Sequence, residues 1–130
     1  RRIISADTAR AVRAMLEAAA SPGGTAPRAQ IMGYRVAGKT GTAHKQEGLS
    51  YASHKYRASF VGFAPVSKPR LVVAVTIDEP SAGKYFGGDV AAPVFSKVME
   101  GALRGLGVAP DAPMKPIELP RESDFVQESI

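Results

Sequence analysis

The 130-residue sequence contains no cysteine, no tryptophan and no asparagine. The absence of cysteine excludes disulfide bonds and thiolate metal sites. The histidines, His44 and His54, lie in a polar stretch, and two isolated histidines do not form a metal site. No apolar run reaches the length of about 18 residues that a membrane-spanning helix needs. The sequence therefore predicts neither a metal site nor a membrane span, and we expect no cofactor.

Charge and size set further limits. Basic residues exceed acidic ones by 17 to 12, which gives a net charge of +5. These basic residues are scattered along the chain, and no nucleic-acid-binding module accompanies them, so we expect no nucleic-acid partner. The length and the 45% hydrophobic content fit one domain, or part of one.

The N-terminal segment has the pattern of a helix. Ser5 or Asp7 can cap a helix that reaches about Ala20, where a Ser-Pro-Gly-Gly run stops it. Apolar residues fall on one side of this helix at helical spacing: Ala9, Val12, Leu16 and Ala19.

The middle of the chain predicts three strands. They cover about residues 31–42, 57–64 and 70–78, and residues 44–55 are too polar for a core and are predicted to be a loop. The third strand is continuously apolar, which indicates a central strand covered on both faces. Short links between consecutive strands indicate an antiparallel meander.

A second helix is predicted after a loop over residues 79–88. Asp89 can cap it, Pro93 falls in its first turns, and it reaches about Arg104. One apolar stripe contains Val94, Val98, Ala102 and Leu106, and a second set widens it: Phe95, Met99 and Leu103. The predicted fold is α+β, with helices covering an antiparallel sheet.

Two parts of the chain differ in composition. Residues 1–108 carry the helix, the three-strand meander and the second helix, whereas residues 109–130 are rich in proline and charge and are predicted to be an extended tail. A sheet of only three strands can hardly cover a third strand that is this apolar. Residues 1–108 are therefore expected to be part of a larger domain.

The most informative motif lies at the end of the first predicted strand. Lys39-Thr40-Gly41-Thr42 offers a fixed cation, two hydroxyl groups and a backbone left bare by glycine. These groups suit the docking of a carboxylate beside a reacting carbonyl group.

The same residues also satisfy the phosphate-binding pattern G-x-x-x-x-G-K-[ST] from Gly33 to Thr40. A phosphate loop needs a helix that begins at the Lys-Thr step. Here strand-forming residues precede that step and Gly41 follows it, so the nucleotide-binding alternative lacks its structural context.

Further segments share an order with a known family: Gly33–Ala43, Phe60–Pro65, Val75–Pro80, Tyr85–Gly88 and Ala91–Phe95. Together they resemble the transpeptidase domain of class B penicillin-binding proteins, most closely the septal peptidoglycan D,D-transpeptidases of Gram-negative bacteria. The resemblance covers about residues 1–110 and implies the C-terminal part of that domain.

Two family motifs are missing. The family uses a serine nucleophile in Ser-x-x-Lys and a second motif, Ser-x-Asn, which a chain without asparagine cannot contain. The literal match Ser81-Ala82-Gly83-Lys84 contains a glycine and follows Pro80. We therefore expect it to be a loop, without the helix that a nucleophile of this type needs. The resemblance implies that an upstream segment of the same protein supplies the serine.

The resemblance also implies the site. Lys39 anchors the substrate carboxylate, Thr40 and Thr42 donate hydroxyl hydrogen bonds, and the Thr42 amide forms half of an oxyanion hole. Gly41 lets the strand edge approach the ligand. Tyr85 and Phe86 form an apolar wall near the cleft, or alternatively a plug over the last helix.

The implied reaction is acyl transfer from a D-Ala-D-Ala stem peptide, with β-lactam antibiotics as inhibitors. The implied partners are the upstream segment, peptidoglycan stem peptides, β-lactams and cell-division proteins. The implied location is the periplasmic side of the inner membrane. A non-catalytic β-lactam sensor domain of the same fold remains an alternative.

Overall fold

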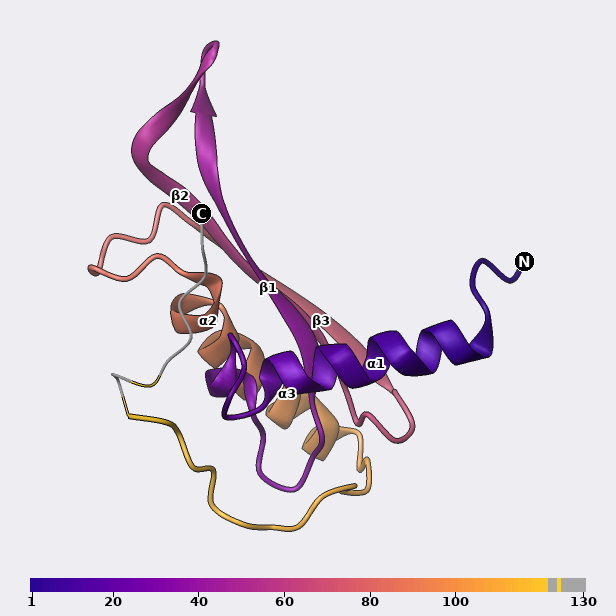
Figure 1. Cartoon of the computed structure of the whole chain (residues 1–130). Coiled ribbons are helices and arrows are strands. Elements are labelled where there is room, and N and C mark those ends of the chain that lie inside the picture. The colour runs from indigo at the N-terminus through magenta and orange to yellow at the C-terminus, as the bar shows by residue number, and fades with distance from the viewer. Residues whose placement is uncertain (122–123, 125–130) are drawn as a thin grey trace.

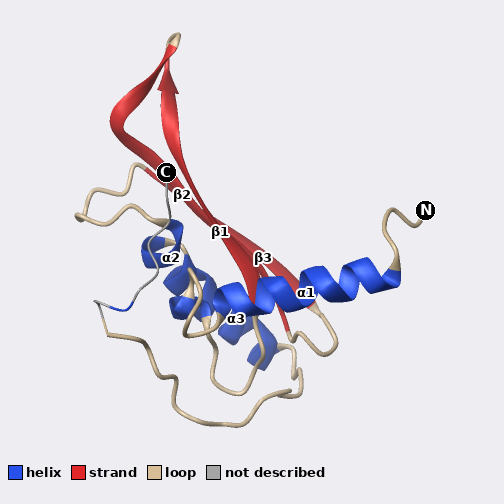
Figure 2. Cartoon of the chain, in the orientation of Figure 1, coloured by secondary structure: helices blue, strands red, loops and turns tan. Residues whose placement is uncertain are grey.

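The computed structural model describes residues 1–121 and residue 124. Its central element is a three-stranded antiparallel sheet in the order β1-β2-β3 (Figures 1 and 2). This arrangement confirms the predicted α+β meander. The elements are α1 (Ala6–Ala20), η1 (Pro27–Ala29), β1 (Ala37–Glu47), β2 (Ser50–Ala64), β3 (Leu71–Asp78), α2 (Gly87–Val90) and α3 (Ala92–Gly105).

Helix α1 begins and ends as predicted. The Ser5 side chain accepts a hydrogen bond from the Thr8 amide at 3.1 Å and so caps the first turn. At the other end, the Ser21 hydroxyl group donates to the Ala18 carbonyl at 2.6 Å. The buried end of α1 is its C-terminus at Ala20, and its N-terminal half projects away from the sheet (Figure 1). Within residues 1–121 and 124, no helix is long and apolar enough to cross a membrane.

The predicted loop over residues 44–55 is wrong. Strand β1 runs to Glu47 and β2 starts at Ser50, so these residues form a long two-stranded ribbon that extends beyond the body of the molecule (Figure 2). Gly48, with φ of +63°, lies in the turn at its tip. Cross-strand hydrogen bonds hold the ribbon together with little burial, which is why the apolar pattern did not reveal it. The start of the first strand was also placed too early, because residues 31–34 form a turn.

Strand β3 is an edge strand among the described residues, not the predicted central one. Its burial alternates: Leu71, Val73, Val75 and Ile77 pack against the core, whereas Val72 is 71% exposed. A continuous apolar run indicates that both faces can be covered, but it does not say which neighbours are present.

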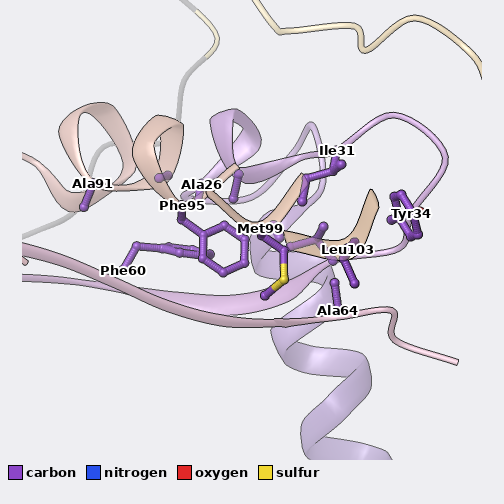
Figure 3. Close-up of a cluster of buried hydrophobic side chains, with 13 residues drawn as sticks. Ala26, Ile31, Tyr34, Phe60, Ala64, Ala91, Phe95, Met99 and Leu103 are labelled. Carbon is purple, nitrogen blue, oxygen red and sulfur yellow. The ribbon is translucent and has the colours of Figure 1, made fainter. Parts of the chain in front are cut away.

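The core lies between the sheet and α3. Phe60 of β2 meets Phe95 of α3 edge to face, with ring centroids 4.7 Å apart, and Met99 and Leu103 continue the contact along the helix (Figure 3). The buried face of α3 therefore consists of Phe95, Met99 and Leu103, which the sequence predicted only as an addition to the main apolar stripe. The predicted main stripe, which includes Val98 and Leu106, is largely exposed. Both sets have helical spacing, so the sequence did not determine which one faces the sheet.

The start of α3 also differs from the prediction. Asp89 does not cap α3, because it lies inside the separate short helix α2. Helix α3 begins at Ala92, with Pro93 in its first turn as predicted and without a side-chain cap.

Helix α2 lies very close to β1, β2 and the turn before η1. A Cβ atom on Gly87 would lie 2.3 Å from the Ser59 carbonyl oxygen, and one on Gly88 would lie 2.2 Å from the Thr25 carbonyl oxygen. Real Cβ contacts are not this short, so both positions require glycine.

The segment that follows α3 forms hydrogen bonds with the residues before β1 and with the turn between β2 and β3. The Asp111 carboxylate accepts hydrogen bonds from the Arg35 amide at 2.7 Å and the Ser67 amide at 3.1 Å. The Tyr34 hydroxyl group donates to the Val108 carbonyl at 2.7 Å. Residues 109–121 contain no helix or strand. A division at residue 108 stays a prediction, and residues 122–123 and 125–130 of the predicted tail lie outside the described residues.

The orientation of α3 can be tested with two leucines of that helix end. Leu103 is fully buried and Leu106 is 64% exposed. Leu103→Ala should lower the free energy of unfolding by about 2–5 kcal/mol, because it leaves a cavity in the core. Leu106→Ala should change it by about 0.5 kcal/mol or less. Urea unfolding measures both, and equal losses would contradict the observed orientation.

The close approach of α2 can be tested with two glycines. Gly88→Ala forces a methyl group onto the Thr25 carbonyl and should destabilise the protein by roughly 1–3 kcal/mol. Gly101, in α3, has open space around it, so Gly101→Ala should stabilise the helix by about 0.5–1 kcal/mol. Thermal unfolding of the two variants is the measurement. A Gly88→Ala protein as stable as the unaltered one would show that the contact is not tight.

Candidate functional site

The Lys39 side chain lies near the start of β1 and folds back toward the next residue, Thr40. Its ammonium group donates to the Thr40 carbonyl oxygen at 3.0 Å and to the Thr40 hydroxyl oxygen at 3.1 Å. No carboxylate lies within ion-pair distance of it among residues 1–121 and 124. An ammonium group has three donors, so one remains for another acceptor. The geometry leaves a cation that a bound anion can neutralise.

Lys45, six residues further along the same strand, is a contrast. It lies at the irregularity in the β1–β2 register and donates to Asp78 at 2.9 Å and Glu79 at 2.6 Å. The hydrogen bonds to Glu79 and Asp78 raise the pKa of Lys45, and the bond from Lys45 lowers the pKa of Asp78. Lys45 is therefore neutralised by two carboxylates, whereas no carboxylate in the described part of the chain neutralises Lys39.

Thr40 is the one polar residue that is buried among those the structure describes, with 5% of its surface exposed. Its hydroxyl group donates to the Thr25 hydroxyl group at 3.4 Å. Thr25 lies in the turn between α1 and η1. Sequence reasoning missed it, because the Ser-Pro-Gly-Gly run around it was interpreted as a helix stop. The only local signal was a hydroxyl residue among turn formers.

Thr42 and Gly41 both contact neighbouring segments. The Thr42 hydroxyl oxygen accepts a hydrogen bond from the Gly87 amide at 3.0 Å, which ties β1 to the start of α2. The Ser59 hydroxyl group donates to the Gly41 carbonyl at 3.2 Å, and a Cβ atom on Gly41 would lie 2.6 Å from that hydroxyl oxygen. Packing against β2 therefore favours glycine at position 41, whatever binds at the edge of the strand.

Tyr85 and Phe86 belong to a row of rings beside Thr42. Tyr85 lies 4.6 Å from Phe86 and stacks on Tyr56 with centroids 4.1 Å apart, and His44 lies 4.6 Å from Tyr56 on the other side. Phe86 immediately precedes Gly87, so the row begins where α2 meets β1. The sequence did not point to Tyr56, and His44 was interpreted as a solvated loop residue. The long ribbon brings both rings into the row.

The competing motifs lack their structural context. Ser81 to Lys84 lie in a loop, and Gly83 has φ of +81°, so the expected loop is confirmed. Lys39 and Thr40 lie inside β1, which continues to Glu47, so no helix begins at the Lys-Thr step. The phosphate-loop alternative is therefore wrong.

Comparison with known proteins identifies a family for this chain. Residues 1–100 match the family described as the penicillin binding protein transpeptidase domain. The chain is 47% identical over 114 residues to a probable peptidoglycan D,D-transpeptidase, PenA, of Neisseria gonorrhoeae. The aligned region covers 88% of this chain and 20% of that protein. It is 46% identical over 111 residues to the peptidoglycan D,D-transpeptidase FtsI of Escherichia coli, covering 85% of the chain and 19% of that protein.

Solved structures resemble the chain as well. The apo structure of the TP domain of Burkholderia pseudomallei penicillin-binding protein 3 superposes with a TM-score of 0.79 at 56% identity, covering 87% of this chain and 34% of that one. The chain spans about a fifth of the length of the curated relatives described above. From its sequence and its fold, the chain belongs to the penicillin-binding protein transpeptidase domain family.

Proposed function

We propose that this chain forms part of a peptidoglycan D,D-transpeptidase that works through an acyl-serine intermediate. The observation that carries the proposal is the Lys39 ammonium group, which has no carboxylate partner among residues 1–121 and 124 and lies on an outermost strand. The names of the relatives support the same reaction class.

The outer edge of β1 suits an extended peptide. Among the described residues, β1 pairs with β2 alone, so its other edge has backbone groups available for a further strand. Peptides commonly bind by adding a strand to such an edge. A stem peptide ending in D-Ala-D-Ala would lie along β1, with its terminal carboxylate near Lys39.

In the proposed reaction, a serine hydroxyl attacks the carbonyl of the penultimate D-alanine. The bond between that carbonyl carbon and the nitrogen of the terminal D-alanine breaks, the serine proton ends on this nitrogen, the terminal D-alanine leaves as the free amino acid, and an acyl ester forms. An amine from a neighbouring stem peptide then attacks the ester carbonyl and gives up a proton. The ester bond breaks, the serine oxygen regains a proton, and the new amide closes the cross-link. The serine belongs to an upstream segment of the same protein, which agrees with the loop conformation of Ser81 and the absence of asparagine here.

The residues of β1 have distinct proposed roles. Lys39 attracts the substrate carboxylate with its remaining donor, an interaction that contributes about 1.5–3 kcal/mol when one partner is charged. Thr40 and Thr42 supply hydroxyl groups beside it. The Thr42 amide forms half of the oxyanion hole, and loss of one such donor lowers rates by about 10²–10³. Gly41 keeps the backbone between them free of a side chain.

The ring row would give the site an apolar wall. Tyr85 and Phe86 extend it from the start of α2, next to Thr42. Aromatic surfaces of this kind pack against the apolar parts of a ligand. We propose that the row contacts the stem peptide or the side chain of a β-lactam.

The wider setting is proposed from the resemblance of the sequence to septal transpeptidases. A septal transpeptidase works with cell-division proteins on the periplasmic side of the inner membrane, and β-lactams acylate its serine in place of the stem peptide. A β-lactam sensor domain of the same fold would also carry the Lys39 strand. A cross-linking assay with stem peptides separates the two, because a sensor is acylated but forms no cross-links.

The role of Lys39 is tested with fluorescent penicillin and the chain joined to its upstream segment. Lys39→Ala should slow labelling by at least about tenfold, because the carboxylate loses a charged partner. Lys45→Ala, the same change on the same strand, should alter the rate by less than about twofold, because Lys45 is already paired with carboxylates.

The rate of label incorporation, followed by gel fluorescence, is the measurement. Equal labelling by the two variants would remove the basis of the proposal, as would labelling of Ser81 in the chain alone. Circular dichroism spectra should be unchanged in both variants, since Lys39 is exposed, Lys45 is half-buried, and neither belongs to the buried core.

A further inference from the structure

The contact between Thr40 and Thr25 has a direction. The Lys39 ammonium group can only donate, so the Thr40 hydroxyl oxygen accepts from it at 3.1 Å. A hydroxyl group has a single proton, and that of Thr40 points to the Thr25 hydroxyl oxygen at 3.4 Å. The sequence of donors therefore runs from Lys39 through Thr40 to Thr25.

The direction of this hydrogen bond is important because Thr40 is buried. Thr40 is 5% exposed, and a buried hydroxyl proton without an acceptor is unfavourable. If Thr25 offered no oxygen, the Thr40 hydroxyl group would turn to find another acceptor. Its lone pair would then no longer face the Lys39 ammonium group, which among the described residues would keep the Thr40 carbonyl alone as a partner.

The backbone around Thr25 is fixed from two sides. The Ala26 amide donates to the Ala19 carbonyl at 2.9 Å, which ties the turn to the end of α1. On the other side Gly88 of α2 packs so closely on the Thr25 carbonyl that a Cβ atom would lie 2.2 Å away. The fold therefore fixes the backbone that carries the Thr25 side chain.

We propose that Thr25 is a positioning residue for Lys39. Its hydroxyl oxygen accepts the Thr40 proton and keeps the Thr40 oxygen turned toward the ammonium group, so that the ammonium group is held at the edge of β1. The turn between α1 and η1 thus contributes to the proposed active site without contacting the substrate. The effect on acylation rests on the proposed transpeptidase function, whereas the effect on Lys39 itself does not.

Two substitutions separate the hydroxyl group from the shape of the side chain. Thr25→Val keeps the shape and removes the acceptor, and Thr25→Ser keeps the acceptor. Thr76→Val is the matched control, because Thr76 is an exposed residue of β3. All variants are made in the chain joined to its upstream segment, and thermal unfolding checks that each is folded.

The first readout concerns Lys39 alone. Trace labelling with acetic anhydride, analysed by peptide mass spectrometry, gives the acetylation of Lys39 relative to Lys68. Thr25→Val should raise this ratio by roughly 3- to 10-fold, the factor that corresponds to one hydrogen bond. Thr25→Ser and Thr76→Val should leave it within about twofold of the unaltered protein. An unchanged ratio in Thr25→Val, or equal ratios in the valine and serine variants, would overturn the proposal.

The second readout is the rate of fluorescent penicillin labelling. Thr25→Val should slow it by roughly 3- to 10-fold, and Thr25→Ser should restore it. A Thr25→Val protein that is labelled as fast as the unaltered one would overturn the link to catalysis. If the unaltered protein takes no label but the acetylation ratios change as expected, the positioning of Lys39 stands and the proposed transpeptidase function fails.

Discussion

The close contact between the start of α2 and the β1–β2 pair is the constraint on which the candidate site depends. Two consecutive glycines, Gly87 and Gly88, allow it, because side chains there would overlap the carbonyl oxygens of Ser59 and Thr25. The contact places the Gly87 amide on the Thr42 hydroxyl oxygen and Phe86 at the end of the ring row. This packing contact therefore brings β1, α2 and the turn before η1 together beside Thr40 and Thr42.

The second determinant is which lysine of β1 lacks a carboxylate partner among the residues that the structure describes. β1 carries two lysines that differ in the charge of their partners. Lys45 is paired with two acidic residues, whereas Lys39 contacts neutral oxygens of Thr40. A lysine surrounded by carboxylates gains little from binding an anion, whereas one with neutral acceptors still attracts a negative charge. The difference explains why the candidate site lies at Lys39, although the sequence shows two similar lysines on one strand.

Local signals in the sequence were enough for part of this picture. The cap at Ser5, the Lys-Thr-Gly-Thr strand and the loop at Ser81 each depend on a few adjacent residues, and the structure has them where they were predicted. The ribbon over residues 44–55 was missed because cross-strand bonds hold it with little burial. The predicted orientation of α3 was wrong, and among the described residues β3 lies at an edge instead of the predicted centre, because both features depend on which elements pack alongside. Thr25 and Tyr56 join the site through contacts distant in sequence, which no local pattern reports.

The most direct test of the account is a crystal structure of the chain joined to its upstream segment and acylated by a β-lactam. The account predicts an ester on a serine outside this chain, with the carboxylate of the drug within hydrogen-bond distance of the Lys39 ammonium group at the outer edge of β1. An ester on Ser81, or a carboxylate bound away from β1 with Lys39 still bound to Thr40 alone, would contradict it.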